Sequence, residues 1–123
     1  MLKNMGYIVA GSASTAKDAI EATQKLDPDL VLMDIHLSGQ SDGIEAASML
    51  WGLYSKPVVY ITGDTKDQTF QRAMKTSPFG FIEKPFNKEL FMLTLKMAFY
   101  RYEDEKKRAE LKFRSTDIDN RDT

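Results

Sequence analysis

Short apolar runs alternate along this chain with segments whose apolar residues recur at helical spacing. Four of the runs are rich in β-branched or aromatic residues, and each predicts a strand buried on both faces; they cover residues 7–10, 30–33, 58–61 and 79–82. Strands that alternate with helices are joined by right-handed crossovers, and such crossovers leave the strands parallel. We therefore expect an α/β fold, a parallel sheet with helices on both faces.

Helix start and stop signals bound the intervening segments. The first helix is expected to begin at Ser14 or Thr15 and to end before Pro28. The second begins at Asp42, which stands in a capping-box-like relation to Glu45, and a weaker helix is expected over residues 66–75. The apolar sides are formed by Ala16, Ala19, Ile20, Thr23 and Leu26 in the first helix and by Ile44, Ala47, Trp51 and Tyr54 in the second.

The last helix is expected to begin at Asn87 and to carry two apolar stripes. One stripe has core spacing (Leu90, Leu93, Met97 and Tyr100), and the other follows a heptad (Met92, Leu95, Phe99, Tyr102, Lys106, Ala109 and Phe113). One face can pack on the sheet and leave the other for a second copy. The alternative is a long amphipathic helix whose charged end is simply solvated.

Charge separates the end of the chain from the rest. Of the 23 residues in 101–123, 14 are charged, seven basic and seven acidic. We therefore expect a compact domain over residues 1–100 and a charged helical extension with a polar tail over 101–123. The final segment, 114–123, is expected to lack regular structure.

Composition excludes several classes of function. A chain of 123 residues with 42% hydrophobic residues fits one domain, and 17 Lys and Arg against 18 Asp and Glu leave no basic excess for nucleic acid. With no cysteine there is no disulfide, thiolate nucleophile or Cys-based metal site. No apolar run is long enough for a membrane span, and the start lacks a signal-peptide core. We expect a cytoplasmic protein with no direct nucleic-acid or membrane partner.

Three of the predicted strands end on polar side chains of different chemistry. Asp34, Thr62 and Lys84 follow the second, third and fourth apolar runs. Because the carboxyl ends of parallel strands meet at one edge, these side chains should share a crevice. There a carboxylate can act as nucleophile, a hydroxyl can bond an oxyanion, and an ammonium can neutralise its charge. The triplet suits a phosphoryl group arriving on Asp34.

Each of the three residues also has a simpler interpretation when taken alone. Asp34 is a common residue type for a turn or cap at a strand end, and Thr62 by itself carries little information. Lys84 followed by Pro85 can protect an edge strand from aggregation. The order of the three, each closing a predicted strand, is what favours a shared phosphate-binding crevice.

Three segments carry a family resemblance: MDIHLSGQSDGIEAA, VVYITGDTKD and GFIEKPF. They resemble the response-regulator receiver domain of two-component phosphorelay signalling, over roughly residues 5 to 100. The resemblance implies a flavodoxin-like (CheY-like) fold with strand order 2-1-3-4-5. It also implies that Asp34 accepts a phosphoryl group from a histidine kinase or phosphotransfer protein. Thr62 and Lys84 would then contact that phosphoryl group.

Further residues take roles through the same resemblance. Phe81 would occupy the aromatic switch position, turning inward when Thr62 moves toward the phosphate. Lys84-Pro85 is a candidate cis peptide, and Gly43 matches the glycine of the family's loop after the aspartate. His36 would offer its backbone carbonyl to Mg²⁺, with its imidazole a solvated loop group.

The sequence departs from the family at its start. Receiver domains open with a strand that ends in an acidic pair holding Mg²⁺, whereas MLKNMGY resembles the last turn of the family's first helix. We therefore expect an N-terminally truncated receiver without strand one and its acidic pair. Asp34 and the His36 carbonyl are then the implied Mg²⁺ ligands, so the cofactor is weakly supported. Asp64 is the nearby substitute carboxylate, although a solvated loop role is the simpler expectation.

Loss of a central strand also predicts self-association. Each buried backbone group left unpaired costs about 1 to 3 kcal/mol. Either the second and third strands of the family's fold close up, or a second copy fills the gap, or the fold is marginally stable. We expect the second outcome, a homodimer through the last helix or the sheet edge.

Three function classes remain open from the sequence. The first is a receiver that switches a protein-binding face on phosphorylation. The second is a receiver-derived dimerisation module that takes no phosphate. The third is an aspartate-nucleophile phosphohydrolase, with His36 standing where that class needs its second acid; it ranks last because cap and metal residues are missing, so we expect no enzyme.

Overall fold

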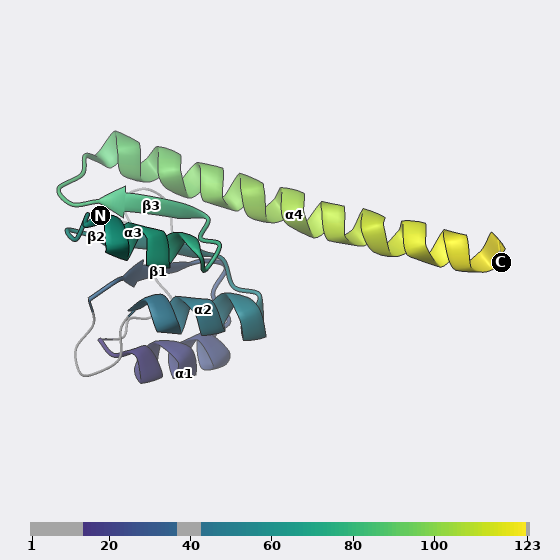
Figure 1. The fold of residues 1–123 in the computed structure, drawn as a ribbon, viewed down its shortest axis with the longest axis horizontal. Coiled ribbons are helices and arrows are strands. Elements are labelled where there is room, and N and C mark those ends of the chain that lie inside the picture. Colours follow the sequence, from purple (N-terminus) through teal and green to yellow (C-terminus); the bar gives the residue numbers. More distant parts are fainter. Residues whose placement is uncertain (1–13, 37–42, 123) are drawn as a thin grey trace.

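The fold is an α/β arrangement in which parallel strands alternate with helices (Figure 1). The computed structural model describes residues 14–36 and 43–122, with side chains to residue 111. Its elements are α1 (Ala16–Leu26), β1 (Val31–Asp34), α2 (Gly43–Tyr54), β2 (Val58–Thr62), α3 (Asp67–Met74), β3 (Gly80–Glu83) and α4 (Lys88–Asp122). Each of these strands lies within one residue of its predicted run. The predicted strand at residues 7–10 lies outside the described residues.

The described strands form one parallel sheet in the order β1-β2-β3. Alternate residues of β2 point to two separate cores. Val58 and Tyr60 pack with residues of α1, α2 and α3, whereas Val59 packs with residues of α4. The predicted parallel sheet with helices on both faces is therefore confirmed. Burial on both faces holds for β2, whereas β1 and β3 are half-buried, so that part of the prediction is wrong for the two outer described strands.

The first helix begins and ends where its sequence signals predict. The hydroxyl of Thr15 caps α1 by accepting the Asp18 backbone N–H at 3.1 Å. Asp27, with φ of 47°, ends it in the left-handed conformation just before Pro28. Leu26 was expected on the buried side, but it lies in the last turn and is 45% exposed. The capping role expected for Asp42 lies outside the described residues.

The last helix packs on the sheet through a different stripe from the one with core spacing. Phe91, Leu95 and Ala98 are buried, with Ala98 small enough to let α4 approach the sheet closely. Which of the two predicted stripes packs on the sheet was left open by the sequence; the stripe of Leu90, Leu93, Met97 and Tyr100 is the exposed one, and these residues are 48%, 56%, 56% and 76% exposed. The heptad stripe fits the buried face better because it contains Leu95 and Tyr102.

An aromatic cluster fixes the point where α4 leaves the domain. The ring of Phe79 packs edge-to-face on Trp51 and Tyr102, with centroids 5.1 and 5.9 Å away. The Tyr102 hydroxyl donates to the Ser55 carbonyl, and the Arg101 guanidinium lies 5.2 Å from the Phe79 ring centroid. These contacts anchor α4 at the end of the sheet opposite Asp34.

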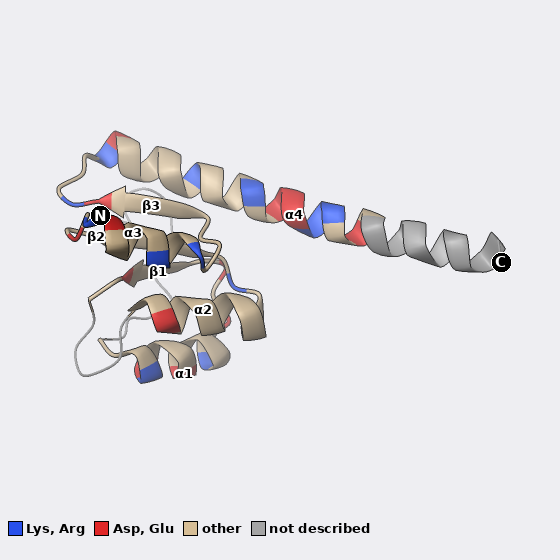
Figure 2. Ribbon diagram, in the orientation of Figure 1, with Lys and Arg blue, Asp and Glu red and all other residues tan. Residues whose placement is uncertain are grey.

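Beyond Tyr102 the helix projects away from the domain (Figure 1). It is 35 residues long, which corresponds to about 52 Å. The helix reaches Asp122, so the expectation that the final segment lacks regular structure is wrong for residues 114–122. Its projecting part carries closely spaced charges of both signs (Figure 2). Among the described helices, none combines the length and hydrophobicity needed to cross a membrane.

Replacing Gly43 or Gly52 of α2 by alanine should have opposite effects on stability. A Cβ at Gly43 would lie 2.0 Å from the Asp34 carbonyl oxygen, whereas a Cβ at Gly52 would meet nothing within 4 Å. We expect Gly43→Ala to lower the free energy of unfolding by about 1–3 kcal/mol. Gly52→Ala should raise it by about 0.5–1 kcal/mol, because alanine is the better helix former. Urea denaturation measures both; equal stability of Gly43→Ala and the parent would contradict the close approach.

Candidate functional site

The parallel register brings the three polar strand ends to one edge of the sheet. Asp34 ends β1 opposite Ile61, and Thr62 ends β2 opposite Glu83. Lys84 directly follows β3, and its backbone N–H donates to the Thr62 carbonyl at 2.8 Å. The structure therefore brings together all three residues that the sequence predicted to share a crevice.

Both carboxylate oxygens of Asp34 are held by hydrogen-bond donors. The Lys84 ammonium donates to Oδ2 at 3.0 Å, and the His36 backbone N–H donates to Oδ1 at 3.0 Å. The two side chains of the Asp34–Lys84 pair are 38% and 46% exposed. Water therefore reaches and screens the pair, which makes it an oriented surface ion pair rather than a buried one.

An open cavity of about 610 Å³ lies over this pair. It is lined by Asp34, His36, Thr62, Gly63, Asp64, Thr65, Lys66 and Lys84. The lining contains two lysine side chains, one histidine and two hydroxyls besides the two carboxylates. Such a set of donors can receive a small anion beside Asp34.

The Thr62 side chain is almost fully buried, with 1% of the residue exposed. Its hydroxyl oxygen accepts the Asp64 backbone N–H at 3.0 Å. The hydroxyl proton remains available to an acceptor in the cavity. The residue thus supplies a donor that is fixed at the strand end by the loop following it.

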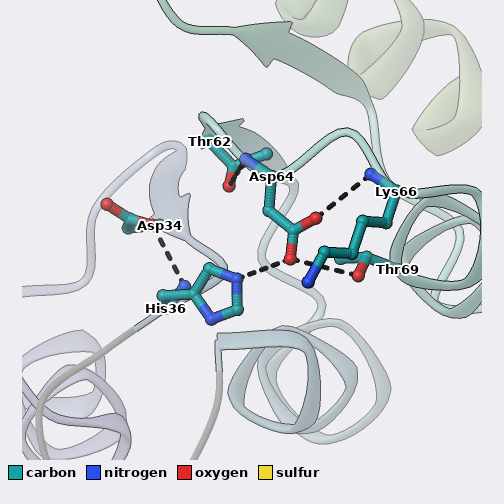
Figure 3. A network of polar contacts seen from close by, with 6 residues as sticks. All are labelled: Asp34, His36, Thr62, Asp64, Lys66 and Thr69. Carbon is teal, nitrogen blue, oxygen red and sulfur yellow. Dashed lines mark hydrogen bonds and ion pairs between the residues drawn. The ribbon is translucent and has the colours of Figure 1, made fainter.

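Asp64 is the centre of a network that links two loops (Figure 3). Its carboxylate accepts from His36 Nε2 at 2.6 Å, from the Lys66 backbone N–H at 3.1 Å and from the Thr69 hydroxyl at 3.1 Å. The His36 hydrogen bond is the main cause that lowers the pKa of Asp64 below its ordinary value, followed by the Lys66 backbone bond. The lowered pKa keeps the carboxylate ionised, and this stabilising contribution is lost as the pH falls through that value.

The expectation of a solvated loop group is therefore wrong for Asp64, whereas the His36 imidazole is exposed as expected. The Asp64 side chain is 11% exposed and fully engaged, so it is not a solvated loop group. The His36 imidazole, 67% exposed, is at the surface as expected but is bound to Asp64 rather than free. Sequence reasoning also missed Lys66 and Thr69. The signal for them is an Asp two residues after a strand and just before a helix, where loop carboxylates accept backbone N–H bonds.

Phe81 lies among other aromatic rings next to the site. Its ring centroid is 6.2 Å from that of Tyr60 and 5.3 Å from that of Phe70, which is 42% exposed. The ring is half-buried on the side of α3. The peptide bond between Lys84 and Pro85 is cis, as the resemblance implied. Gly43 donates its backbone N–H to the Ile35 carbonyl at 2.8 Å, directly behind Asp34.

Side-chain ligands for a metal ion are sparse among the described residues. Within residues 14–36 and 43–111, no three His, Asp or Glu side chains lie close enough together to hold a metal ion. Asp64, the substitute carboxylate considered above, already accepts three hydrogen bonds. Asp34 and the His36 carbonyl remain the ligands implied by the resemblance.

Comparison with known proteins agrees with this geometry. The profile of the response regulator receiver domain matches residues 1–96. The transcriptional regulatory protein PdtaR of Mycobacterium tuberculosis is 29% identical over 104 residues, which are 85% of this chain and 50% of that protein. The chemotaxis protein CheY of Halobacterium salinarum is 33% identical over 87 residues, covering 70% of this chain and 72% of that protein.

Solved structures show the same fold. The signal receiver domain of a modulated diguanylate cyclase from Desulfovibrio desulfuricans is 34% identical, with a TM-score of 0.79 over 85% of this chain and 82% of that one. NtrX from Brucella abortus is 27% identical, with a TM-score of 0.77 over 89% of this chain and 25% of that one. The chain spans about half the length of PdtaR and a quarter of NtrX.

The solved structures support the flavodoxin-like fold, and the profile match supports the family. A profile match over 96 of 123 residues covers most of the chain. The chain belongs to the family of response regulator receiver domains, the receiving modules of two-component signalling.

Proposed function

We propose that this receiver accepts a phosphoryl group on Asp34 from a histidine kinase or phosphotransfer protein and thereby changes a protein-binding face. The observation that carries the proposal is the Lys84 ammonium, 3.0 Å from the Asp34 carboxylate at the floor of an open cavity. A lysine in this position offsets the repulsion between an attacking carboxylate and an incoming phosphoryl group.

The chemistry follows from the groups in the cavity. An Asp34 oxygen attacks the phosphorus of a phosphohistidine, forming an O–P bond while the N–P bond breaks and its electron pair leaves on the imidazole. Lys84, released from the free carboxylate, can donate to a phosphoryl oxygen. The buried Thr62 hydroxyl can donate to another. Both donors stand at strand ends on the same edge of the sheet as Asp34, so only a local movement is needed for them to reach the phosphoryl group.

The face proposed to change is formed by α3, β3 and α4. Phe81 packs edge-to-face on Phe70 of α3, whose ring is 42% exposed. A movement of Thr62 toward the phosphoryl group would leave space for Phe81 to turn inward, and Phe70 would lose its partner ring. A local contact at the cavity can in this way alter an exposed aromatic surface by shifting a two-state equilibrium.

The role of Mg²⁺ is left to experiment because the described carboxylates do not fit a metal set. Lys84 and Lys66 are the cavity's cationic side chains, together with any proton on His36. The phosphorylation assay below is therefore run with and without Mg²⁺.

A second candidate function is association through α4 without phosphate. The observation that favours it is the exposed stripe of Leu90, Leu93, Met97 and Tyr100 on a helix that projects beyond the domain. Such contiguous apolar surface is typical of interaction sites. Pairing through a sheet edge is the alternative route to a homodimer.

Intact mass spectrometry tests phosphorylation at Asp34. After incubation with acetyl phosphate and Mg²⁺, the parent chain should gain one phosphoryl group, and Asp34→Asn should gain none. Lys84→Met, which removes the ammonium but keeps a similar volume, should slow the gain at least roughly tenfold. Omitting Mg²⁺ shows how much of the charge neutralisation the side chains provide.

A folded parent chain that gains no phosphoryl group, with a kinase domain or with acetyl phosphate, would contradict the first proposal. Equal gain by Asp34→Asn would show that another residue is modified. Circular dichroism of each variant confirms that the helices and the sheet are intact.

Light scattering tests association through the α4 stripe. At micromolar concentration the parent should have the mass of a dimer, and Leu93→Glu should shift it to a monomer, because a charge would be buried in the interface. Leu53→Glu is the matched control, since Leu53 is an exposed leucine of α2 outside the stripe (66% against 56% exposed). A monomeric parent would count against association, and a monomeric Leu53→Glu would place the interface elsewhere.

A further inference from the structure

Two loops from different strands are joined across the mouth of the cavity. His36 lies in the loop after β1 and Asp64 in the loop after β2, and their side chains meet with Nε2 2.6 Å from Oδ2. This contact connects residues 28 positions apart in the sequence. It lies directly beside Asp34, whose Oδ1 accepts the His36 backbone N–H.

The same Asp64 determines where the Thr62 hydroxyl lies. Its backbone N–H donates to Thr62 Oγ1 at 3.0 Å, while its carboxylate is held by His36, the Lys66 backbone and Thr69. His36 is the one of these three carboxylate partners that belongs to the β1 side of the cavity (Figure 3). The position of Thr62 relative to Asp34 therefore depends on a contact that spans both loops.

We propose that the His36–Asp64 contact is a latch that holds the unphosphorylated geometry of the site, with His36 as a positioning residue. The proposal deepens the proposed function and rests on it. For Thr62 to turn toward a phosphoryl group on Asp34, its bond with the Asp64 N–H must lengthen or break. The loop carrying Asp64 must then move, and this movement pulls the carboxylate away from His36.

The latch opposes phosphorylation through a linked equilibrium. A contact that exists only in the unphosphorylated geometry stabilises that geometry relative to the phosphorylated one. Removing it should therefore raise both the rate at which Asp34 takes a phosphoryl group and the mobility of the loop at residues 63–66. Loss of one hydrogen bond to a charged group at a half-exposed site should change the phosphorylation rate and the loop's exchange rate by roughly two- to tenfold.

The ring geometry favours this role over proton transfer by His36. Because a carboxylate accepts the bond, Nε2 carries the hydrogen and Nδ1 is the remaining basic nitrogen. In the view of Figure 3 that nitrogen points away from Asp34 and Thr62. In this arrangement the imidazole serves as a tether between loops.

Hydrogen exchange of the unphosphorylated chain tests the latch independently of the proposed function. His36→Leu, which removes the donor and keeps the bulk, should speed amide exchange at residues 63–66 by roughly two- to tenfold and leave α1 unchanged. His36→Gln retains a donor for Asp64 and should restore slow exchange. Gln24→Ala, which removes a surface contact between α1 and α2 away from the cavity, is the matched control and should leave exchange at residues 63–66 unchanged.

Phosphorylation by acetyl phosphate provides the second readout. His36→Leu should gain the phosphoryl group roughly two- to tenfold faster than the parent, with His36→Gln near the parent. The double variant His36→Leu, Asp64→Ala should behave like Asp64→Ala alone, because the two residues act through one contact.

The outcomes separate the two proposals. Unchanged exchange at residues 63–66 in His36→Leu overturns the latch whether or not the chain is phosphorylated. If exchange is faster in His36→Leu but the parent chain takes no phosphoryl group, the latch is supported as a restraint on the loop. The proposed function is then refuted. Faster exchange combined with slower phosphorylation, or additive effects in the double variant, also overturns the latch.

Discussion

The parallel register of the strands is the constraint on which the rest of this receiver depends. Because Val31 pairs with Val58 and Val59 with Gly80, the strands end within about one residue of each other at the same edge. That alignment places a carboxylate, a hydroxyl and an ammonium around one cavity. Gly43 lets α2 begin against the end of β1, because no side chain fits between its backbone and the Asp34 carbonyl. Packing and site geometry are thus set by the same backbone contacts.

The two ends of the sheet differ in the side chains that surround them. At the carboxyl end, half-exposed polar groups such as Lys84 and Asp34 surround an open cavity. At the opposite end, Trp51, Phe79 and Tyr102 form an aromatic cluster that anchors α4. The aromatic anchor of α4 is thus separated from the polar contacts around Asp34. Aromatic packing lies at one end of the sheet, and the polar groups of the candidate site lie at the other.

The polar network around Asp64 shows how loop residues can be as constrained as core residues. A carboxylate with three donors, one of them from another loop, cannot move without breaking several contacts. Its backbone N–H holds Thr62 at the same time. The cavity is therefore lined by groups whose positions are interdependent, which is the physical requirement for a site that converts a local modification into a change of shape.

The sequence by itself determined the described strands, most helix ends and the three strand-end residues that share the cavity. Apolar runs, the Thr15 cap and the stop before Pro28 are local signals, and strand ends such as Asp34 and Lys84 follow from the rule that parallel strands end together. Only the tertiary structure decided which stripe of α4 is buried. Leu93 and Leu95 are equally apolar, and the orientation of the helix is fixed by the sheet and by Phe79, residues distant in sequence. The same holds for the contact between His36 and Asp64, because a hydrogen bond between two loops exists only once the strands beneath them have paired.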